Sequence, residues 1–357
     1  TKDLLMKTTI ASSSGYSYQY KNMGQTSNKG VELQLDAVLV DAKDFGLNFN
    51  FNISYNRGKI DKLNGSSFWQ SSSWAGTAAA GIEDFLVEEG GRLGEVYGYK
   101  TDGFYTADDF TFDAEKGTYA LKAGVNDCSS LIGGKVYPGS IKLKANEDGE
   151  YKKERLGNTV PTVSGGFGLN ARWKGFDFTA FFNYSLGNKI VNATKLGSSF
   201  YSGSSKNWNI NDHFTSANRY SWIDPSTGTN LLSSASIKAN GEAWTINRLN
   251  EVNTGSSIWN PAAATVMPLV DWAVEDGSFL RVNNITIGYT LPKLFVSKLN
   301  IQNIRIYVTG YNLHCFTKYS GTDPEVDCCT STPMTPGIDY AAYPKSRSFV
   351  GGINVTF

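Results

Sequence analysis

The sequence predicts an all-β protein, and more specifically the strands of an antiparallel transmembrane β-barrel. Three observations indicate this fold class. Apolar residues alternate with small polar ones along several stretches, which is the period of a strand with two different faces. Glycine is frequent, with 37 of 357 residues, and aromatic residues make up 13%. Short connections between the alternating stretches take turns with long ones, as in barrels with turns on one membrane side and loops on the other.

Composition excludes several other classes of protein. Lys+Arg and Asp+Glu number 33 each, so the net charge is zero and no basic surface for nucleic acid is predicted. No run of about 18 apolar residues is present, so a transmembrane helix is not expected. The first residues contain neither a Met start nor a signal peptide. We therefore expect either a mature chain or a fragment whose N-terminus lies upstream.

The cysteines and histidines form no metal-binding pattern. Cys128, Cys315, Cys328 and Cys329 lack the C-x-x-C spacing of zinc sites, and the two histidines are isolated. Because adjacent cysteines rarely pair with each other, one of Cys328 and Cys329 is favoured as a disulfide partner of Cys315.

The clearest alternation lies at residues 45–56. Six apolar side chains share one face of this stretch, and the other face carries only Asn, Ser and Gly. The polar face of a soluble sheet would normally carry Lys, Glu and Thr, whereas Asn, Ser and Gly suit a water-filled lumen. A short polar turn at 41–44 joins this strand to a preceding one at 28–40.

The same reasoning predicts about eight strands along the chain. Their ranges are 1–9, 28–40, 45–56, 161–173, 176–189, 279–292, 303–313 and 346–357. In the sixth strand the apolar phase reverses, so a β-bulge is expected near Asn283–Asn284.

Connection lengths separate a membrane barrel from a soluble β-sandwich, which shows no such rule. The short links are 41–44, 174–175 and 292–302, and the long ones are 11–27, 57–160, 190–277 and 314–345. Aromatic residues at the strand ends are expected to form girdles at the membrane surfaces. They are Phe45, Tyr55, Trp173 and Phe176.

The last strand, Ser346–Phe357, is predicted to close the barrel. Its apolar face, expected to touch lipid, carries Phe349, Ile353, Val355 and Phe357. Its second edge needs a first strand, because an open edge leaves backbone groups unsatisfied in lipid at several kcal/mol each. The polar inner face does not fill a small barrel of eight strands. We therefore expect the first strands of a larger barrel to lie outside these residues.

Motifs in a fixed order point to a known family. They are Asn28-Lys29-Gly30-Val31-Glu32, Gly94-Glu95-Val96-Tyr97-Gly98-Tyr99, Gly157-Asn158-Thr159-Val160-Pro161, Ser278-Phe279-Leu280-Arg281, Gly288-Tyr289-Thr290-Leu291-Pro292, Asn312-Leu313, Thr317-Lys318-Tyr319-Ser320-Gly321-Thr322-Asp323-Pro324-Glu325-Val326, Tyr343-Pro344-Lys345-Ser346-Arg347 and the terminal Phe357. Together, across nearly the whole chain, they resemble the C-terminal half of the SusC/RagA-like TonB-dependent outer-membrane transporters.

The resemblance implies a barrel of 22 strands with an N-terminal plug, in the outer membrane of a Gram-negative bacterium. It also implies import of oligosaccharides, or of peptides in some members. The implied partners are a SusD-like surface lipoprotein, which acts as a lid, and the TonB–ExbB–ExbD system. The plug and the first strands match nothing in this chain, so the resemblance places them upstream or in a separate chain.

Family members often carry a calcium-loop-like acidic run, which here spans residues 144–150. This run begins with Lys144, which offers no oxygen ligand. No metal and no cofactor are therefore predicted, and the run is expected to form a solvated turn. Asp323, Pro324 and Glu325 match the most specific motif, and a structural role in the last loop is expected for them.

An enzyme is not predicted, because G-x-S-x-G, H-E-x-x-H and P-loop motifs are absent from the sequence. The main alternatives are the same transporter class with a peptide substrate and a secreted carbohydrate-binding β-protein without transport activity. A passive porin is a further alternative, which the family resemblance opposes. The rule of connection lengths opposes the secreted protein.

Candidate contact residues follow from this interpretation. Flat aromatic rings in the long loops are expected to stack on the substrate, with packing inside the loops as the alternative role: Trp69, Trp74, Trp208, Trp222, Trp244 and Trp259. Polar side chains on the inner face are expected to line the lumen or contact the plug: Asn48, Asn50, Asn52, Arg172, Asn183 and Arg305.

Overall fold

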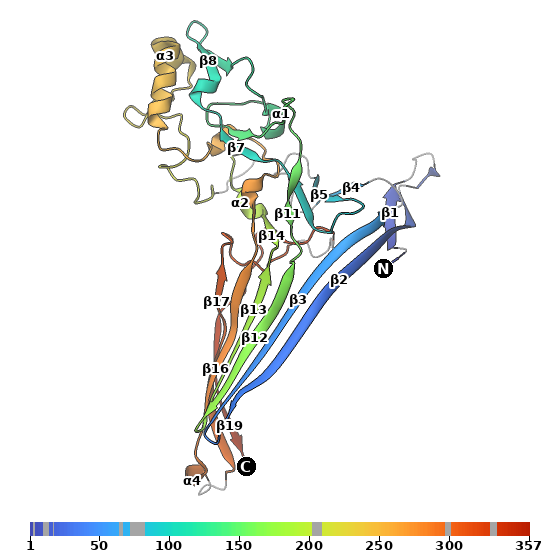
Figure 1. The fold of residues 1–357 in the computed structure, drawn as a ribbon. Helices are drawn as coiled ribbons and strands as arrows, with labels where there is room; N and C mark the ends of the chain where they lie inside the picture. The colour runs from blue at the N-terminus through green and yellow to red at the C-terminus, as the bar shows by residue number, and fades with distance from the viewer. Residues whose placement is uncertain are drawn as a thin grey trace.

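An antiparallel sheet of eight strands is the largest element of the molecule (Figure 1). The computed structural model describes residues 1–2, 4–9, 14–16, 18–63, 67–71, 83–201, 209–296, 301–328 and 334–357. The strand order is β1-β2-β3-β12-β13-β16-β17-β19. These strands are β1 (Leu4–Thr9), β2 (Tyr18–Asp41), β3 (Phe45–Leu63), β12 (Val163–Trp173), β13 (Phe176–Leu186), β16 (Phe279–Thr290), β17 (Asn303–Thr317) and β19 (Ser348–Thr356). The all-β fold class is confirmed, and each predicted strand range overlaps one of these strands.

The other elements are short and lie mainly in the long connections. The further strands are β4 (Phe68–Ser71), β5 (Glu83–Val87), β6 (Glu95–Gly98), β7 (Thr101–Phe104), β8 (Phe110–Asp113), β9 (Thr118–Leu121), β10 (Ile141–Leu143), β11 (Glu154–Asn158), β14 (Lys189–Asn192), β15 (Val274–Asp276) and β18 (Ile338–Asp339). The α-helices are α1 (Ser129–Ile132), α2 (Ala193–Gly197), α3 (Ser234–Val252) and α4 (Lys293–Val296), and 3-10 turns occur at Ala107–Asp109, Pro261–Ala263 and Asp271–Ala273.

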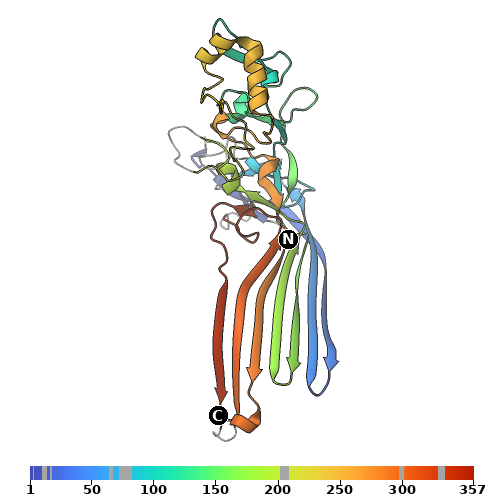
Figure 2. The ribbon, with the colours of Figure 1, turned by 90° about the vertical axis from the view of Figure 1, so that its left-hand side faces the viewer.

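Figure 2 shows the broad side of the sheet, with β19 and β2 on opposite sides and the short turns together at the lower end. The long connections after β3, β13 and β17 all leave from the upper end (Figure 1). The short and long connections therefore alternate as predicted, with the short turns at one end of the sheet and the long connections at the other.

Strands β2 and β3 are longer than predicted. β2 begins at Tyr18, so the expected loop at 11–27 is wrong for residues 18–27, and β3 continues to Leu63. Their ladder pairs Gly24 with Leu63 at one end and Asp41 with Gly46 at the other. The residues outside the alternating pattern stay extended because the partner strand satisfies their backbone N–H and C=O groups.

The register keeps the two faces of the sheet chemically distinct. β12 pairs with β3 and with β13 along its full 11 residues without a shift. Asn50 lies opposite Gly168 and Asn52 opposite Gly166, whereas Phe51 lies opposite Phe167. Because side chains alternate along each strand, amides and small residues gather on one side, the polar face, and aromatic and aliphatic residues on the other, the apolar face.

A β-bulge in β16 reverses the faces where the sequence predicts it. The register with β17 shifts between Val282 and Asn284, so the bulge expected near Asn283–Asn284 is confirmed. On β17, Asn312 has a φ of 55°, a left-handed conformation that Asn tolerates better than most residues. The bulge brings Arg281 onto the polar face, opposite Asn183 of β13.

Large side chains stand exposed along the apolar face. Val31 is 72% exposed, Ile287 is 55% exposed and Ile353 is 65% exposed. Within the part of the chain that the structure describes, no helix has both the length and the apolar character needed to cross a membrane.

Above the sheet, the long connections pack into one unit, the loop domain, formed by the described residues of 83–158, 189–276 and 318–345 (Figure 1). Its core contains Val96, Val191 and Ile338, which are all fully buried. Each of these comes from a different long connection. The hydrophobic core therefore joins segments that are far apart in the sequence.

Helix α3 lies beside β8 at the end of the loop domain that is farthest from the sheet (Figure 1). The Ser233 hydroxyl caps its N-terminus by accepting from the N–H of Ser236, and Gly241, at a φ of 75°, interrupts its helical geometry. The Arg248 guanidinium donates to both carboxylate oxygens of Asp224, at 2.7 and 2.8 Å. These hydrogen bonds from Arg248, together with those from Ser226, hold the pKa of Asp224 well below its usual range.

Candidate functional site

Two ion pairs lie along the polar face of the sheet. Arg172 of β12 donates to Asp41 of β2 at 2.6 Å. Arg305 of β17 binds both oxygens of Asp177 of β13, at 2.9 and 2.5 Å. A side chain at Gly288, on the strand between β13 and β17, would collide with Asp177 and Arg305. The bidentate pair therefore lies flat across the sheet, a geometry that the planar guanidinium favours.

The amides of β3 occupy the same face further towards the N-terminal side of the sheet. The Asn52 side-chain oxygen accepts from the N–H of Gly166 at 3.0 Å. Nearby on β2, Gln34 donates to Asp36 at 3.0 Å, and Ser54 of β3 donates to Glu32 at 3.2 Å. These groups give this part of the face a hydrophilic surface.

A cluster of charged groups attaches the last loop to the upper end of the polar face. We call Arg281, Asn312, Asp323, Glu325 and Lys345 the Arg281 clasp. Arg281 donates to Asp323 at 2.5 Å, to Glu325 at 2.6 Å and to the Asn312 side chain at 2.7 Å. Lys345 binds Glu325 at 2.8 Å. Arg281 and Asp323 are each only 3% exposed, so each neutralises a charge that would be costly to bury alone.

Glu275 forms a second junction, between the connection from β13 to β16 and the last loop. Its carboxylate accepts from the backbone and side chain of Ser320 at 2.8 and 2.7 Å, and from Asn192 at 3.2 Å. The Lys195 ammonium lies 3.1 Å from the same carboxylate and 4.1 Å from the centre of the Trp272 ring. Burial raises the pKa of Glu275, but the hydrogen bonds from Ser320 and the charge of Lys195 outweigh it and lower the pKa.

A cavity of about 360 Å³, the loop pocket, lies between these connections. Its wall includes Asn211, Asp212, Thr322, Ala342, Tyr343 and Pro344. Behind it, the Tyr319 hydroxyl donates to Asp339 at 2.6 Å. Burial, with this hydrogen bond to Asp339, raises the pKa of Tyr319, so the hydroxyl stays a donor.

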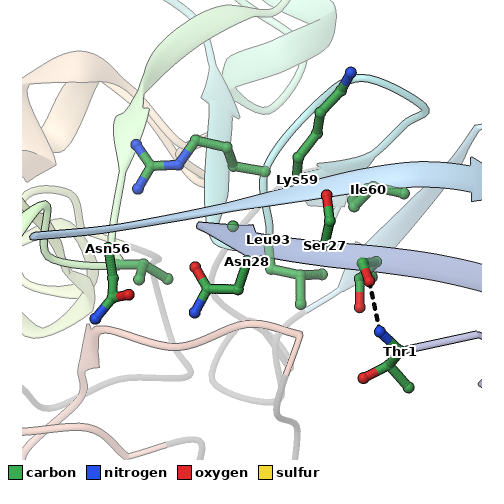
Figure 3. Close-up of a pocket in the computed structure, with 11 residues that line it drawn as sticks. Thr1, Ser27, Asn28, Asn56, Lys59, Ile60 and Leu93 are labelled. Carbon is green, nitrogen blue, oxygen red and sulfur yellow. Dashed lines mark hydrogen bonds between the residues drawn. The ribbon is translucent and has the colours of Figure 1, made fainter. Parts of the chain in front are cut away.

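A second hollow, of about 520 Å³, lies beside the upper ends of β2 and β3 (Figure 3). Its wall includes Asn28, Asn56, Ile60 and Leu93. The backbone amine of Thr1 donates to the Thr26 carbonyl oxygen at 2.8 Å. This hollow contains fewer convergent hydrogen-bonding side chains than the loop pocket, and we assign no ligand to it.

The structure gives the predicted tryptophans different environments. Trp74 and Trp208 lie outside the described residues, and Trp69 belongs to β4. Trp244 is 43% exposed on α3. Trp222 is half-buried, and its ring N–H donates to the Pro138 carbonyl oxygen at 2.6 Å.

Trp259 is a core residue of the loop domain. It is 4% exposed, its ring packs against Phe214 and Trp272, and its N–H donates to the Ser199 carbonyl oxygen. This burial opposes the predicted substrate contact, because the ring presents no open face to a ligand. The hydrophobic effect favours burial of this ring, but the sequence around a loop tryptophan does not show whether the ring is buried or exposed.

The predicted lumen residues Asn48, Asn50, Asn52, Arg172, Asn183 and Arg305 do share the polar face. Asn183 also reaches the Arg281 clasp, with its amide 3.4 Å from Glu325. The contacts that these residues would make with a plug stay a prediction.

Two further predictions, on the 144–150 run and on the cysteines, can be compared directly. At 144–150 the Asn146 side chain accepts from the N–H groups of Asp148 and Glu150, which forms a turn. Cys315 has a free thiol, so its favoured pairing with Cys328 is wrong, and Cys329 lies outside the described residues. Cys315 lies directly opposite Arg281 on the neighbouring strand β16.

Sequence reasoning identified the components of the clasp but not their assembly. The expected structural role of Asp323 and Glu325 in the last loop agrees with their contacts to Arg281. The motifs that contain Arg281, Asn312, Asp323 and Lys345 occur in one order along the chain, and this shared order was the available signal. The loop pocket had no such signal, because its wall comes from four separate segments.

The chain is similar over its whole length to curated receptors. It is 29% identical over 363 residues to TonB-dependent receptor P3 of Formosa agariphila, with 100% of this chain and 31% of that relative covered. It is 23% identical over 369 residues to TonB-dependent receptor SusC of Bacteroides thetaiotaomicron, with 29% of that protein covered. The chain is a relative of the SusC-like TonB-dependent receptors. The resemblance inferred from the sequence motifs is therefore confirmed.

This SusC-like chain spans about a third of the length of the curated relatives that it matches. No family model matches it. The relatives are receptors by name, and on that ground the prediction that the chain is not an enzyme is confirmed.

The fold of the SusC-like chain also matches solved structures. The structure of the RagAB peptide transporter aligns over 100% of this chain and 32% of that one, with a TM-score of 0.62 and 22% identity. The RagAB peptide importer in its open-open state aligns with a TM-score of 0.61. At this identity the likeness establishes the fold, an antiparallel barrel wall with long loops at one end.

Proposed function

We propose that the chain forms the C-terminal strands of an outer-membrane transporter that imports oligosaccharides in a TonB-dependent manner. Its proposed partners are a SusD-like surface lipoprotein over the loop domain, the TonB–ExbB–ExbD system, and the plug and remaining strands that complete a barrel of 22 strands. The similarity to TonB-dependent receptors over the whole chain supports this proposal.

The single observation that carries the proposal is the contrast between the two faces of the sheet. One face exposes aliphatic and aromatic side chains, whereas the other carries amides and ion pairs. Soluble monomers rarely expose apolar patches larger than a few hundred Å². A barrel wall with lipid on its outer side and a water-filled lumen on its inner side accounts for both the apolar and the polar face.

The closing strand follows the same division. Phe349, Ile353, Val355 and Phe357 are 70%, 65%, 42% and 80% exposed, and we assign them to the lipid-facing side. The polar face, with Asn48, Asn50, Asn52, Arg172, Asn183 and Arg305, is assigned to the lumen and the plug. Of the predicted substrate-contacting tryptophans, Trp244 retains an exposed ring on α3 for a ligand or a partner protein.

Deletion of residues 351–357 tests the barrel assignment. These residues supply most of the hydrogen-bonded ladder between β19 and β17. Their loss should abolish outer-membrane assembly, with the protein retained or degraded in the periplasm. The control Asn354→Ala keeps the strand and should assemble normally. Normal surface levels of the deletion variant, measured by surface labelling, would contradict the proposal.

Peptide import is the second candidate function, favoured by the fold match to the RagAB peptide transporter. Uptake of labelled oligosaccharides and peptides by cells with and without the intact receptor separates the two substrate classes. Receptor-dependent uptake of peptides alone would replace the glycan proposal and leave the barrel assignment intact.

A further inference from the structure

We infer that the loop pocket binds a sugar residue of a neutral oligosaccharide, an inference that rests on the proposed import function. The pocket holds about 360 Å³, which lies at the lower end of ligand-site volumes, about 300–1,000 Å³. Its wall combines segments near residues 192–195, 211–213, 320–322 and 341–344.

The walls of the loop pocket are fixed before any ligand arrives. Thr322 precedes Asp323 in the chain and Pro344 precedes Lys345, so two wall segments end in the Arg281 clasp. On the opposite wall, the Thr194 hydroxyl oxygen accepts from the N–H of Ala341 at 2.8 Å. A preformed site saves the entropy of ordering its loops when a ligand binds.

The side chains that face the pocket match the surface of a sugar ring. Tyr343 is 90% exposed and offers a flat apolar ring for the C–H face of a pyranose. The Asp212 carboxylate is 97% exposed, with one oxygen 3.2 Å from the His213 ring nitrogen, and it can accept from sugar hydroxyls. The Thr322 hydroxyl, also exposed, can both donate and accept.

The charges around the loop pocket favour a neutral ligand. Lys195 is held by Glu275 and by the Trp272 carbonyl oxygen, at 3.1 and 3.0 Å. This cation is therefore already neutralised and poorly placed to bind an anionic ligand. An extended peptide would need hydrogen bonds to its backbone, which strand edges usually provide. Of the described residues in the pocket wall, only Asn192 of β14 and Asp339 of β18 belong to strands, and each is the last residue of its strand. Hydroxyl, amide and carboxylate side chains on several loops suit a sugar better.

The test uses the complete receptor, purified in detergent, and isothermal titration calorimetry. The probes are neutral hexasaccharides of glucose, xylose, mannose and galactose, with a hexapeptide of uncharged residues as the rival ligand. At least one hexasaccharide should bind. Tyr343→Ala and Asp212→Asn should each raise its Kd about tenfold, by loss of a stacking ring and of a charged acceptor.

Two control variants sharpen the assignment. Tyr343→Phe keeps the ring and should bind nearly as the unchanged receptor does, and Tyr16→Ala removes an exposed tyrosine outside the pocket and should have no effect. Because Tyr343 is almost fully exposed, its replacement should leave the thermal unfolding curve unchanged.

Several outcomes would overturn the inference. They are binding of the hexapeptide in place of every sugar, binding of no sugar, and sugar binding that neither Tyr343→Ala nor Asp212→Asn weakens. The proposed function is tested separately, by measuring outer-membrane assembly of the unchanged receptor and of both variants in the cells that produce them. An assembled, importing receptor with unchanged sugar affinity in both variants contradicts only the pocket assignment.

Discussion

The loop domain buries large apolar side chains in its core, whereas the sheet exposes them on one face. In the loop domain, Tyr105, Ile141 and Leu249 are at most 2% exposed and pack together in one core. On the apolar face of the sheet, Phe349 and Ile353 are 70% and 65% exposed. The hydrophobic effect requires burial only where water is the solvent. We interpret the difference as the adaptation of one chain to two solvents, lipid around the sheet and water around the loops.

The sheet and the loop domain are joined by ion pairs and by hydrogen bonds to charged side chains. The Arg281 clasp attaches the last loop to the sheet, and Glu275 joins that loop to the connection between β13 and β16. The stability that a buried ion pair contributes depends on its geometry, and removing one partner leaves the other charge buried without compensation. The junction should therefore be the most sensitive place in which to separate the two regions.

Arg281→Ala should give the largest effect. It leaves the Asp323 carboxylate buried without its cation and should cost about 3–5 kcal/mol of unfolding free energy. The matched control is Arg305→Ala, which breaks a more exposed pair on the same face and should cost about 1 kcal/mol or less. Chemical denaturation, with proteolysis of the last loop, measures both. Equal losses for the two variants would contradict a special role of the clasp.

Leucine truncations compare the two solvents directly. Leu249→Ala opens a cavity in the loop core and should cost about 2–5 kcal/mol. Leu33→Ala changes a side chain that is 57% exposed on the apolar face, where lipid can fill the space, and should cost much less. Unfolding of the receptor in lipid vesicles gives both values. A larger loss for Leu33→Ala would show that another protein surface, and not lipid, covers this face.

Arginine substitutions on neighbouring residues of β19 distinguish its faces. Ile353→Arg places a charge on the apolar face and should cost about 2–4 kcal/mol near the membrane midplane. Asn354→Arg places the same charge on the polar face, where Asn354 lies opposite Arg305, and should be tolerated better. Yield of folded barrel in the outer membrane reports the difference. Equal tolerance at both positions would contradict the lipid-facing assignment.

Acid should have a smaller effect, confined to the loop domain. Hydrogen bonds from Arg248 and Ser226 lower the pKa of Asp224 below its ordinary value of 3.8. The stabilisation is therefore fully present above the unfolded pKa and is lost as the pH falls through the lower folded pKa. Hydrogen exchange of α3 should accelerate at low pH in the unchanged protein, and Asp224→Asn should lack this pH dependence. An identical pH profile for both proteins would remove Asp224 as the cause.

Particular residues show which features of the fold local sequence predicts and which it does not. Alternation at 45–56 and the phase reversal at Asn283–Asn284 predicted the strands and the bulge, because side-chain direction in a strand follows directly from position. Residues 18–27 of β2 were missed because their pairing, with β1 up to residue 24 and with β3 from residue 24 onward, depends on the partner strands and not on a local pattern.

The environment of the loop side chains depended on distant partners. The Glu242 carboxylate accepts from the N–H of Phe112, 130 residues earlier, and the Asp271 carboxylate accepts from Thr101, 170 residues earlier. Trp259 and Trp244 lie 15 residues apart, yet one is buried and the other is 43% exposed. Neither sequence neighbourhood distinguishes them.

The sequence by itself determined the strands, the two faces of the sheet and the family, because these follow from a period of two residues and from motifs in a fixed order. Only the tertiary structure decided which loop residues became core, clasp or pocket. Those roles depend on contacts between connections that are far apart in the chain. Their ends are brought together only when the strands pair and place every long connection at one end of the sheet.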